Sequence, residues 1–480
     1  MRIFPHLKGE EAFIDYEYSL PFKGRVGVGM GYNHDAIYVA VYNLRRFMND
    51  KFDCIIIGAG PAGIACAYKL AKSGLNAIVF ERGEYPGSKN VSGGVLYSTV
   101  LNKLIPEFWK YAPVERHVAK RRYSILSENS EMAVELNFNR FNEPPYNNSF
   151  TVLRAKFDRW FAKKAEDAGA FVLNETVVDD FIWQDGKVIG VKARREGGDI
   201  YADMVVCAEG ANSLLAEKAG LKKKPTEHQM ITAAKEVISL PREVIEDRFN
   251  LSGDEGVVME FFGDAVKGMI GSGFIYTNKD SLSVGVGCPI AIMKKNNMRP
   301  NDLLDAFKSH PMIKNFLRGG KTEELSAKMI PEPGYKNLPK FVANGLLIVG
   351  DAAGLVNPSL YREGSNMAMA SGVMAAETII EAKEKGDFSE AGLAGYGRRL
   401  RESFVMQDLK RYGDAPERLS EMPELFKEYP DAILKMTEGY FTVSDVSKAE
   451  MQRVARNGFK DKVSVWKFLW DMYKVRRGIL

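Results

Sequence analysis

Cysteine is scarce in this sequence, and the few cysteines lie far apart. Only Cys54, Cys66, Cys207 and Cys288 occur among 480 residues. No two of them have the short spacing that a zinc knuckle or an iron–sulfur loop requires. None of the five histidines has a neighbour at metal-ligand spacing either. The sequence therefore predicts no locally encoded metal site, and any electron-carrying metal must belong to a partner.

Long apolar runs and a strong net charge are also missing. No stretch of about twenty mostly apolar residues is free of charges, so we expect no membrane-spanning helix. Lys8, Glu10 and Glu11 interrupt the first residues before a signal-peptide core can form, which predicts a cytoplasmic protein. Lys and Arg number 66 against 62 Asp and Glu, a net charge of +4. That charge is too small to indicate a nucleic-acid-binding protein.

The composition that remains is that of a globular chain, 45% hydrophobic and 27% charged. A chain of 480 residues exceeds the size at which one hydrophobic core usually divides. We therefore expect two or three domains.

The most informative segment is FDCIIIGAGPAG, residues 52–63. Its apolar run from Cys54 to Ile57 predicts a buried parallel strand that leads directly into Gly58, Gly60 and Gly63. In a dinucleotide-binding turn the first glycine allows a tight turn and the second lets a diphosphate approach the backbone. The third lets the helix pack close to the sheet. The start of that helix then faces the phosphates.

A second strand and an acidic residue complete this unit. The sequence predicts a helix from Ile64 to Ser73, ended by Gly74, and a strand from Ala77 to Phe80 that leads into Glu81. Glu81 is placed where a ribose hydroxyl needs an acceptor. The alternative is a simple glycine-rich turn. We assign a glycine-rich turn or strand to residues 27–31, where Gly27, Gly29 and Gly31 lack the required spacing of the third glycine and no helix follows.

A second glycine turn lies far downstream, in GLLIVGDAAG at residues 345–354. There an apolar strand leads into Gly350 and Asp351. The segment resembles the second FAD fingerprint of glutathione-reductase-type and hydroxylase-type flavoproteins. The resemblance implies that Asp351 accepts a hydrogen bond from a ribityl hydroxyl and that the following helix points its N-terminus at the flavin ring. NAD has no ribityl chain, so FAD is the expected cofactor.

Two weaker segments between these turns resemble the same flavoproteins. VLRAKFDRWF at 152–161 resembles the helix whose arginine, here Arg154, lies by the isoalloxazine or the diphosphate. VVCAEGANSLLAEKAG at 205–220 resembles a segment that normally carries aspartate, and the longer Glu209 here puts a direct contact in doubt. Val178 stands where such folds hold the adenine with backbone groups.

The most specific resemblance is carried by GSKNVSGG at residues 87–94, which is similar to the GxKNVSGG signature of FixC-type flavoproteins. These are relatives of electron-transfer-flavoprotein:quinone oxidoreductase and geranylgeranyl reductase. The segments at 235–250 and 273–287 agree, so the resemblance covers about residues 50 to 440. Two glycines without Cβ atoms and the polar Asn90 and Ser92 suit contact with a flavin ring. The alternative is a polar surface turn.

The fingerprints and the resemblance together predict a set of cofactor-binding residues, and no catalytic acid or base is demanded. The predicted residues are Gly58, Gly60, Pro61, Ala62, Gly63, Glu81, Arg82, Asn90, Val91, Ser92, Gly93, Gly94, Arg154, Val178, Gly210, Gly350, Asp351 and Gly364.

The expected fold is α/β: a Rossmann-type FAD-binding domain of glutathione-reductase or hydroxylase type, an inserted antiparallel-sheet substrate domain, and a helical C-terminal region. We expect the FAD-binding domain in pieces at 51–115, 150–225 and 338–395. Residues 116–149 and 226–337 would form the β-rich quinone domain, with a half-buried strand at 280–287 and a connecting loop at 331–339. Residues 396–480 would be helical, and 1–50 an N-terminal arm, with a strand near 36–42, to which no role is assigned.

The resemblance implies a FAD-dependent oxidoreductase that accepts electrons from electron-transfer flavoprotein (ETF) and passes them to membrane quinone. It also implies a ferredoxin-like iron–sulfur partner, and membership of an NADH-dependent bifurcating ETF complex is one form of this interpretation. The sequence has no second glycine motif that could bind a nicotinamide cofactor. One alternative is a geranylgeranyl-reductase-like enzyme that saturates isoprenoid lipid double bonds. Another is a noncatalytic docking subunit with structural FAD.

Location is indicated by the last residues of the chain. The aromatic and apolar residues Trp466, Phe468, Leu469, Trp470 and Tyr473 are mixed with the basic residues Lys467, Lys474, Arg476 and Arg477. This pattern is typical of a segment that rests on a membrane surface, and it equally suits a helix docked on the protein's own core or on a partner. Because quinones dissolve in the bilayer, we expect a cytoplasmic protein that is peripheral at the inner face of the membrane.

Overall fold

The computed structural model describes residues 51–90, 94–195 and 197–478, with side chains up to Arg476. The chain divides into two units at residue 50, and the whole description concerns the second, residues 51–480. The expected N-terminal arm, its strand near 36–42, the glycine-rich turn at 27–31 and the site residues Val91, Ser92 and Gly93 lie outside the described residues.

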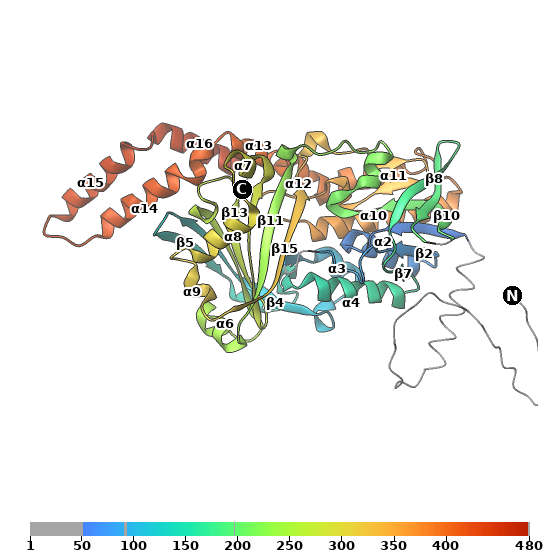
Figure 1. The fold of residues 1–480 in the computed structure, drawn as a ribbon, viewed down its shortest axis with the longest axis horizontal. Coiled ribbons are helices and arrows are strands. Elements are labelled where there is room, and N and C mark those ends of the chain that lie inside the picture. The colour runs from blue at the N-terminus through green and yellow to red at the C-terminus, as the bar shows by residue number, and fades with distance from the viewer. Residues whose placement is uncertain (1–50, 91–93, 196, 479–480) are drawn as a thin grey trace, which may run out of the picture. The chain divides into compact units, whose positions relative to one another are not determined.

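The first sheet has the strand order β16-β17-β10-β1-β2-β7 (Figure 1). These neighbours pair in parallel except β16, which is antiparallel to β17. The strand β1 pairs in parallel with both β2 and β10, and β10 pairs in parallel with β17. A hairpin of β8 and β9 joins the sheet through β10. The strands of this sheet are β1 (Phe52–Ile57), β2 (Ala77–Phe80), β7 (Phe171–Leu173), β8 (Val178–Gln184), β9 (Lys187–Ala193), β10 (Asp199–Cys207), β16 (Val342–Ala343) and β17 (Leu346–Ile348).

Helix α2 (Pro61–Lys72) connects β1 to β2 and lies between α4 (Arg154–Asp167) and α10 (Ser365–Lys385). The predicted strand, helix and second strand are confirmed, and the helix begins one turn earlier than expected because Pro61 starts its first turn. A Cβ atom added to Gly372 of α10 would overlap the carbonyl oxygen of Ala62 in α2. Gly372 therefore serves the close packing of α10 against α2.

The second sheet has nine strands in the order β15-β11-β14-β13-β12-β4-β6-β3, with β5 on the side of β4. All of its pairs are antiparallel except β12 with β4. Its strands are β3 (Gly94–Tyr97), β4 (Val114–Leu126), β5 (Glu131–Asn137), β6 (Ser149–Val152), β11 (Met230–Ser239), β12 (Glu255–Gly263), β13 (Ser272–Thr277), β14 (Ser281–Pro289) and β15 (Lys321–Pro331). The predicted strand at 280–287 is β14.

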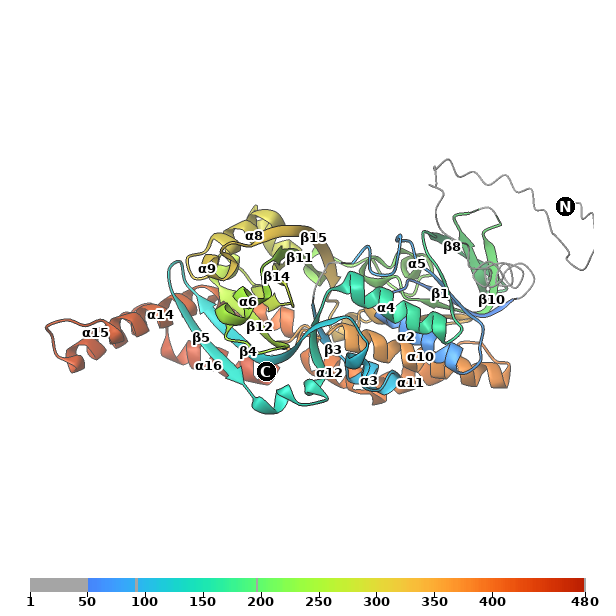
Figure 2. The same cartoon turned by 90° about the horizontal axis from the view of Figure 1, so that it is seen from below.

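Short helices cover one face of this sheet and close an apolar core that contains Phe261, Val284 and Phe307 (Figure 2). They are α6 (Arg242–Phe249), α7 (Ile290–Lys295), α8 (Pro300–Ser309) and α9 (Lys314–Leu317). The strands β3 and β6 fall within the segments expected for the FAD-binding domain, yet they pair with each other and β6 pairs with β4. The second sheet thus includes β3 and β6 in addition to the strands of the segments expected for the quinone domain.

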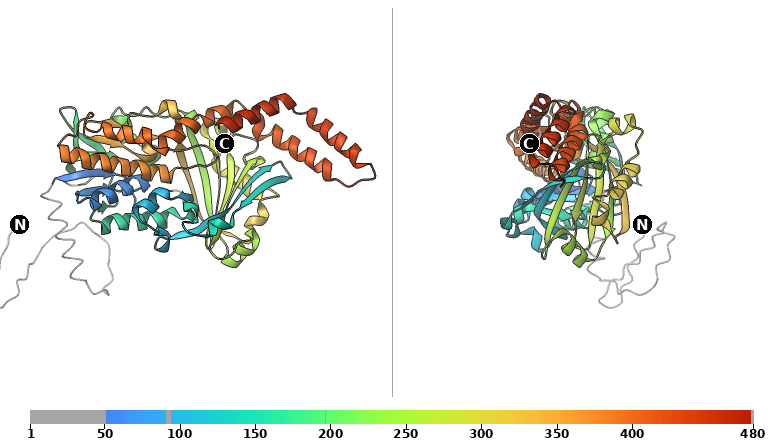
Figure 3. Two further views of the ribbon diagram at one scale, coloured as in Figure 1. Left: turned by 180° about the vertical axis from the view of Figure 1, so that it is seen from behind. Right: turned by 90° about the vertical axis from the view of Figure 1, so that its left-hand side faces the viewer.

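The C-terminal region is helical, as predicted. Helices α14 and α15 lie side by side as a hairpin, and α16 returns along α14 (Figures 1 and 3). The remaining helices are α3 (Thr99–Leu104), α5 (Leu214–Lys218), α11 (Ala394–Glu402), α12 (Phe404–Tyr412), α13 (Ala415–Ser420), α14 (Glu428–Phe441), α15 (Lys448–Lys460) and α16 (Val465–Gly478). Within the described residues, none of the helices combines the length and apolarity needed to cross a bilayer.

The close contact between α2 and α10 gives a first prediction. We expect Gly372→Ala to lower the free energy of unfolding by about 1–3 kcal/mol, because the added methyl group must displace the backbone of α2. Denaturant unfolding followed by circular dichroism measures this effect. The matched control is Gly458→Ala in α15, where an added Cβ meets nothing within 4 Å, and it should leave stability unchanged or raise it by up to about 1 kcal/mol. Equal effects at both positions would contradict the packing role.

Candidate functional site

The glycine turn after β1 opens onto a cavity of about 1010 Å³. Gly60, which caps α2 with φ −80°, lines this cavity, and a Cβ added there would meet no atom within 4 Å. Gly63 differs, because its added Cβ would overlap the carbonyl oxygen of Gly58. Gly58 has φ +107° and lies close to the backbone of Ala208. The three glycines therefore differ in their surroundings: Gly58 makes the turn, Gly60 faces open space, and Gly63 packs closely against the turn and the sheet.

Glu81 follows β2 and is fixed by the neighbouring backbone. Its Oε2 accepts a hydrogen bond from the Ala59 amide at 3.0 Å, and its Oε1 accepts one from the Gly83 amide at 2.7 Å. Both oxygens retain a second lone pair, and the side chain lines the cavity beside Thr176 and Val178. This end of the cavity thus presents a positioned acceptor next to the start of β8.

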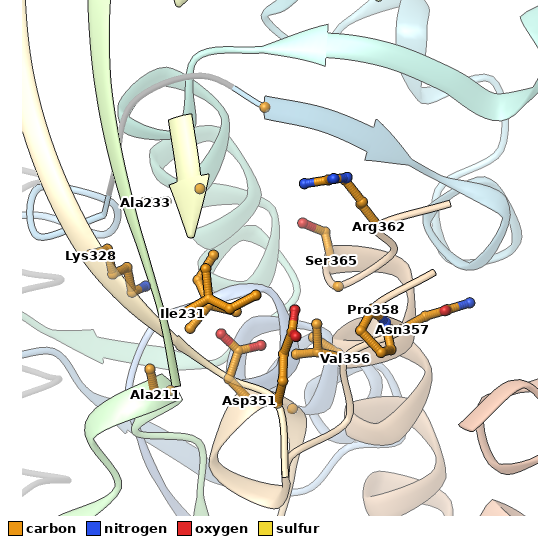
Figure 4. A pocket seen from close by; sticks show the side chains of 18 of the residues that line it. Ala211, Ile231, Ala233, Lys328, Asp351, Val356, Asn357, Pro358, Arg362 and Ser365 are labelled. Atoms are coloured by element: carbon orange, nitrogen blue, oxygen red, sulfur yellow. The ribbon is translucent and has the colours of Figure 1, made fainter. Parts of the chain in front are cut away.

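The second glycine turn reaches the same cavity from β17. Gly350 has φ +61°, and its amide donates to Ser371 Oγ of α10 at 2.9 Å. The Asp351 carboxylate lines the cavity and makes no hydrogen bond or ion pair to another described residue (Figure 4). Gly364 and Ser365, at the start of α10, line the cavity as well. A loop of residues 354–364, which sequence reasoning did not interpret, separates Asp351 from that helix.

The loop that begins at Gly87 is tied to α4 and β15 by a chain of polar contacts. Asn90 Nδ2 donates to Asp158 Oδ2 at 2.6 Å, and Lys328 Nζ donates to Asn90 Oδ1 at 3.2 Å. Arg154 holds Asp158 with two hydrogen bonds of 2.8 Å. The predicted arginine therefore lines the cavity with one edge engaged by an acidic side chain, a partner that the sequence pattern did not reveal.

The Glu209 side chain, for which the sequence put contact with a ligand in doubt, makes its hydrogen bonds to nearby residues of its own segment. Its carboxylate accepts hydrogen bonds from the Leu215 and Ala216 amides at the start of α5, at 3.1 and 3.3 Å, and from Cys207 Sγ at 2.9 Å. Burial raises the pKa of the Glu209 carboxyl group, and these hydrogen bonds oppose the rise. The neighbouring Gly210, with φ +72°, faces the cavity.

The structure brings most of the predicted site residues to one cavity. Gly63 does not line it, and Val91, Ser92 and Gly93 lie outside the described residues. Lining the cavity are Gly58, Gly60, Pro61, Ala62, Glu81, Arg82, Asn90, Gly94, Arg154, Val178, Gly210, Gly350, Asp351 and Gly364.

Sequence reasoning missed a second group of polar residues in the cavity. Lys235 of β11 and Lys328 of β15 face it from the second sheet. Arg362 approaches from the loop before α10 and pairs with Glu260 of β12, Nε to Oε2 at 3.0 Å. Burial raises the pKa of Glu332 to about 7, against the opposing effect of Arg362. The one signal for this group in the sequence is Lys235, a lysine inside the apolar pattern of residues 230–239. The other residues reach the cavity only because distant segments pair in the folded protein.

Beyond these polar groups the cavity becomes apolar. Its walls there come from the C-terminal helices and the loops beside them, and include Leu419, Leu425, Ile433, Phe468 and Met472. The cavity therefore has three parts: a glycine-rich end at the first sheet, a charged middle between the two sheets, and an apolar end under α14 and α16.

The glycine-rich end has the chemistry that a flavin dinucleotide needs. Added Cβ atoms at Gly60, Gly94, Gly210 and Gly364 would all meet open space, so the backbone there leaves room for a ligand. The N-termini of α2 and α10 offer amide donors to phosphate and to ring oxygen atoms. Glu81 and Asp351 offer acceptors to two sets of hydroxyl groups. The residues present therefore fit FAD.

The described residues contain no group of three or more His, Cys, Asp or Glu side chains that could hold a metal ion. The four cysteines are buried and free. Burial raises the pKa of the Cys66 and Cys288 thiols, which keeps both groups protonated.

Comparisons with known proteins point to the same cofactor. A family model described as FAD dependent oxidoreductase matches residues 53–138 and 146–282, and one described as ETF-QO/FixC family C-terminal domain matches residues 415–480. The chain is 43% identical to the protein FixC of Bradyrhizobium diazoefficiens over 90% of this chain and 99% of that protein. It is 40% identical to a probable electron transfer flavoprotein-quinone oxidoreductase of Escherichia coli, over 89% and 98% of the two chains.

Solved structures show the same fold at lower identity. A geranylgeranyl bacteriochlorophyll reductase-like protein from Thermoplasma acidophilum matches with a TM-score of 0.64 and 24% identity, covering 88% of this chain and 99% of that chain. A flavin-dependent brominase matches with a TM-score of 0.59 and 18% identity, covering 86% and 100%. At these identities the likeness concerns the fold alone.

The open space beside Gly60 gives a prediction about cofactor retention. We expect Gly60→Val to weaken FAD binding roughly tenfold or more, about 1.4 kcal/mol, because the side chain would occupy the path of the diphosphate. The extended backbone at Gly60 tolerates valine, and an added Cβ displaces no protein atom, so the fold should persist. The flavin absorbance of the purified protein and the circular dichroism of the apoprotein measure the two effects. Full flavin retention would contradict the proposed approach of the diphosphate.

Proposed function

This chain belongs to the FixC family of FAD-dependent oxidoreductases, and we propose on that basis that it accepts electrons from ETF and passes them to a quinone. The relative from Escherichia coli is named as a probable electron transfer flavoprotein-quinone oxidoreductase. The observation that carries the proposal is the continuity of the cavity, which joins the glycine-rich end to an apolar end through a charged middle. A dinucleotide and an apolar electron acceptor can therefore meet inside one protein.

The predicted cofactor residues suggest how FAD is held. The adenosine half is proposed to lie by Glu81 and Val178, the diphosphate by Gly60 and the start of α2, and the ribityl chain by Asp351. Bound FAD supplies the site that takes up and releases electron pairs. The protein's own contribution is to fix the cofactor against the start of α10 and to shield it from water between the two sheets.

The apolar end is proposed to receive the quinone. Its side chains from α14 and α16 suit a hydrophobic molecule. The charged middle holds Arg362, Glu260 and Glu332, which can donate or accept hydrogen bonds at a polar head group. Proteins of this type require no nucleophile, because electron transfer depends on proximity and on tuned potentials.

The proposed partners are the ETF subunits and a ferredoxin-like iron–sulfur subunit. The four separated cysteines of this sequence do not form a cluster-binding motif, so an iron–sulfur cluster between ETF and this chain would belong to the partner. Assembly into an NADH-dependent bifurcating complex is the more specific form of this proposal. The sequence has no second glycine motif for a nicotinamide cofactor, and in this proposal NADH would bind to a partner subunit.

The electron donor can be tested by an anaerobic visible spectrum of the purified chain, challenged in turn with NADH, NADPH, and reduced ETF with its iron–sulfur partner. We expect the flavin absorbance to bleach only with the protein donors, because the chain offers FAD and quinone parts but no nicotinamide-binding turn. Rapid bleaching by NADPH alone would contradict the proposal and favour the isoprenoid-reductase alternative. A flavin that no physiological donor reduces would instead indicate a noncatalytic docking subunit.

The membrane surface is the proposed location of this reaction, at the inner face. One side of α16 packs inward, where Phe468 and Met472 contact the core around Tyr429. Tyr429 donates to Asp471 at 2.7 Å and holds the helix in place. The other side presents Trp466, 83% exposed, and Trp470, 58% exposed. Basic residues outnumber acidic ones from 448 to 477, which suits an anionic lipid surface.

We expect the double variant Trp466→Ser and Trp470→Ser to bind anionic phospholipid vesicles roughly tenfold more weakly than the wild type, because two large apolar side chains no longer enter the interface. Vesicle co-sedimentation measures this change. The control Tyr201→Ser alters a comparably exposed aromatic side chain on β10, 47% exposed, and should bind normally. Equal binding by all three proteins would contradict a membrane role for α16. Loss of reduction by the protein donor without loss of vesicle binding would assign the surface to a partner.

A further inference from the structure

The loop before α10 holds Arg362 in an unusual backbone conformation. Arg362 has φ +46°, in the left-handed region that residues with a Cβ atom rarely adopt. Its amide donates to the Ser359 carbonyl oxygen at 3.0 Å, and the Asn357 amide donates to the Glu363 carbonyl oxygen at 2.9 Å. Asn357 and Ser359 are 1% and 2% exposed. The loop is therefore closed by its own hydrogen bonds, and it fixes the point from which the Arg362 side chain extends.

The Arg362 side chain lines the charged middle of the cavity and leaves hydrogen-bond donors free (Figure 4). Its Nε atom pairs with Glu260 Oε2 of β12 at 3.0 Å. The Arg362 side chain is 40% exposed and the Glu260 side chain 5% exposed, so the arginine is the open member of the pair. A guanidinium group has five N–H donors. Those on the two Nη atoms of Arg362 donate to no other described residue, so they are available to a ligand.

A second arginine gives this part of the cavity an excess of positive charge. Arg121 of β4 lines the cavity as well. Burial lowers the pKa of Arg121 and of Arg362, but acidic and phenolic neighbours, Glu260 among them, raise both above the ordinary value. Glu332 is a further acidic neighbour of Arg362, and burial raises its pKa, which favours its neutral form. Two arginines therefore share the carboxylate of Glu260.

A flat aromatic surface lies close to these charges. The rings of Phe274 and Tyr276 on β13 are stacked, with centroids 4.7 Å apart and planes at 18°, and both side chains line the cavity. Burial raises the pKa of the Tyr276 phenol, and the charge of Arg362 opposes that rise, so the two side chains are near one another. An aromatic surface beside a cationic donor suits a planar molecule that carries oxygen atoms.

The charge on the acceptor changes during its reduction, and a fixed cation responds to that change. A carbonyl oxygen of a quinone gains negative charge as electrons arrive. A positioned, charged donor therefore stabilises the reacting quinone more than the quinone that first binds, which speeds the transfer. The double bond of an isoprenoid lipid has no oxygen atom at which such a donor could act. A free guanidinium group in the middle of the cavity thus favours a carbonyl compound as the acceptor.

We propose that Arg362 donates a hydrogen bond to a carbonyl oxygen of the quinone and stabilises the negative charge that develops there, and that Glu260 positions Arg362 for this contact. The inference rests on the proposed function and names the residue that recognises the acceptor. In the step, the quinone gains two electrons and one proton from the reduced cofactor and a second proton from water, and becomes a quinol. Arg362 keeps its own protons, because a guanidinium group does not lose them in proteins.

The test follows reoxidation of the FAD-loaded protein after anaerobic reduction by light with EDTA as the electron source, so ETF is not needed. Stopped-flow absorbance records the flavin after mixing with ubiquinone-1 or with ferricenium, a one-electron acceptor without a carbonyl oxygen. We expect Arg362→Met to slow reoxidation by saturating quinone roughly ten- to hundredfold and to leave the ferricenium rate unchanged. Arg362→Lys keeps the charge but not the planar fork, so its quinone rate should be intermediate. Glu260→Gln should also slow the quinone reaction alone, by less than Arg362→Met.

The matched control is Arg398→Met on α11, an exposed arginine that does not line the cavity, and both of its rates should equal those of the wild type. Flavin absorbance checks that each variant binds FAD, and the lysine variant supplies the comparison if the methionine variant fails to load. Unchanged quinone rates in the Arg362 variants, or equal losses with both acceptors, would overturn the inference alone. A wild-type flavin that ferricenium oxidises and quinone does not would contradict the proposed function, and the inference with it.

Discussion

The parallel register of three strands is the constraint on which the site depends. β1 pairs with β10 so that Ile57 faces Cys207, and β10 pairs with β17 so that Cys207 faces Ile348. The carboxyl ends of these strands therefore meet at one edge of the sheet. Each strand is followed within a few residues by a glycine that faces the cavity: Gly58, Gly210 and Gly350. Segments almost 300 residues apart in the chain thus form one backbone surface for a dinucleotide.

The second sheet supplies what that backbone surface lacks. The first sheet contributes glycines, amide donors and two acidic acceptors, which can hold a cofactor. Strands β11 and β15 bring the cations Lys235 and Lys328 to the same cavity, and the loop before α10 brings Arg362. The C-terminal helices then close the far end with apolar side chains. In the proposed function, different parts of the chain therefore hold the cofactor, set its charge environment and admit an apolar acceptor.

Local sequence predicted the parts of the site that local physics determines. The strand, glycine turn, helix and second strand around Gly58 depend on neighbours in the chain, and the structure has all of them. The approach of Lys235, Lys328 and Arg362 depends on strand pairing and loop placement over long separations, which no local pattern encodes. The same holds for β3 and β6, whose membership of the second sheet follows from their pairing with β4 rather than from their own composition.

A density map of the flavin-loaded protein would test the central claim most directly, because it shows which end of the cavity holds which part of the cofactor. The account predicts the adenine beside Glu81 and the start of β8, and the isoalloxazine ring beside Asn90, the start of α10 and the cations of the second sheet. The apolar end under α14 and α16 should remain available for a second molecule. A map that places the ring at the β8 end, or outside this cavity, would contradict the account.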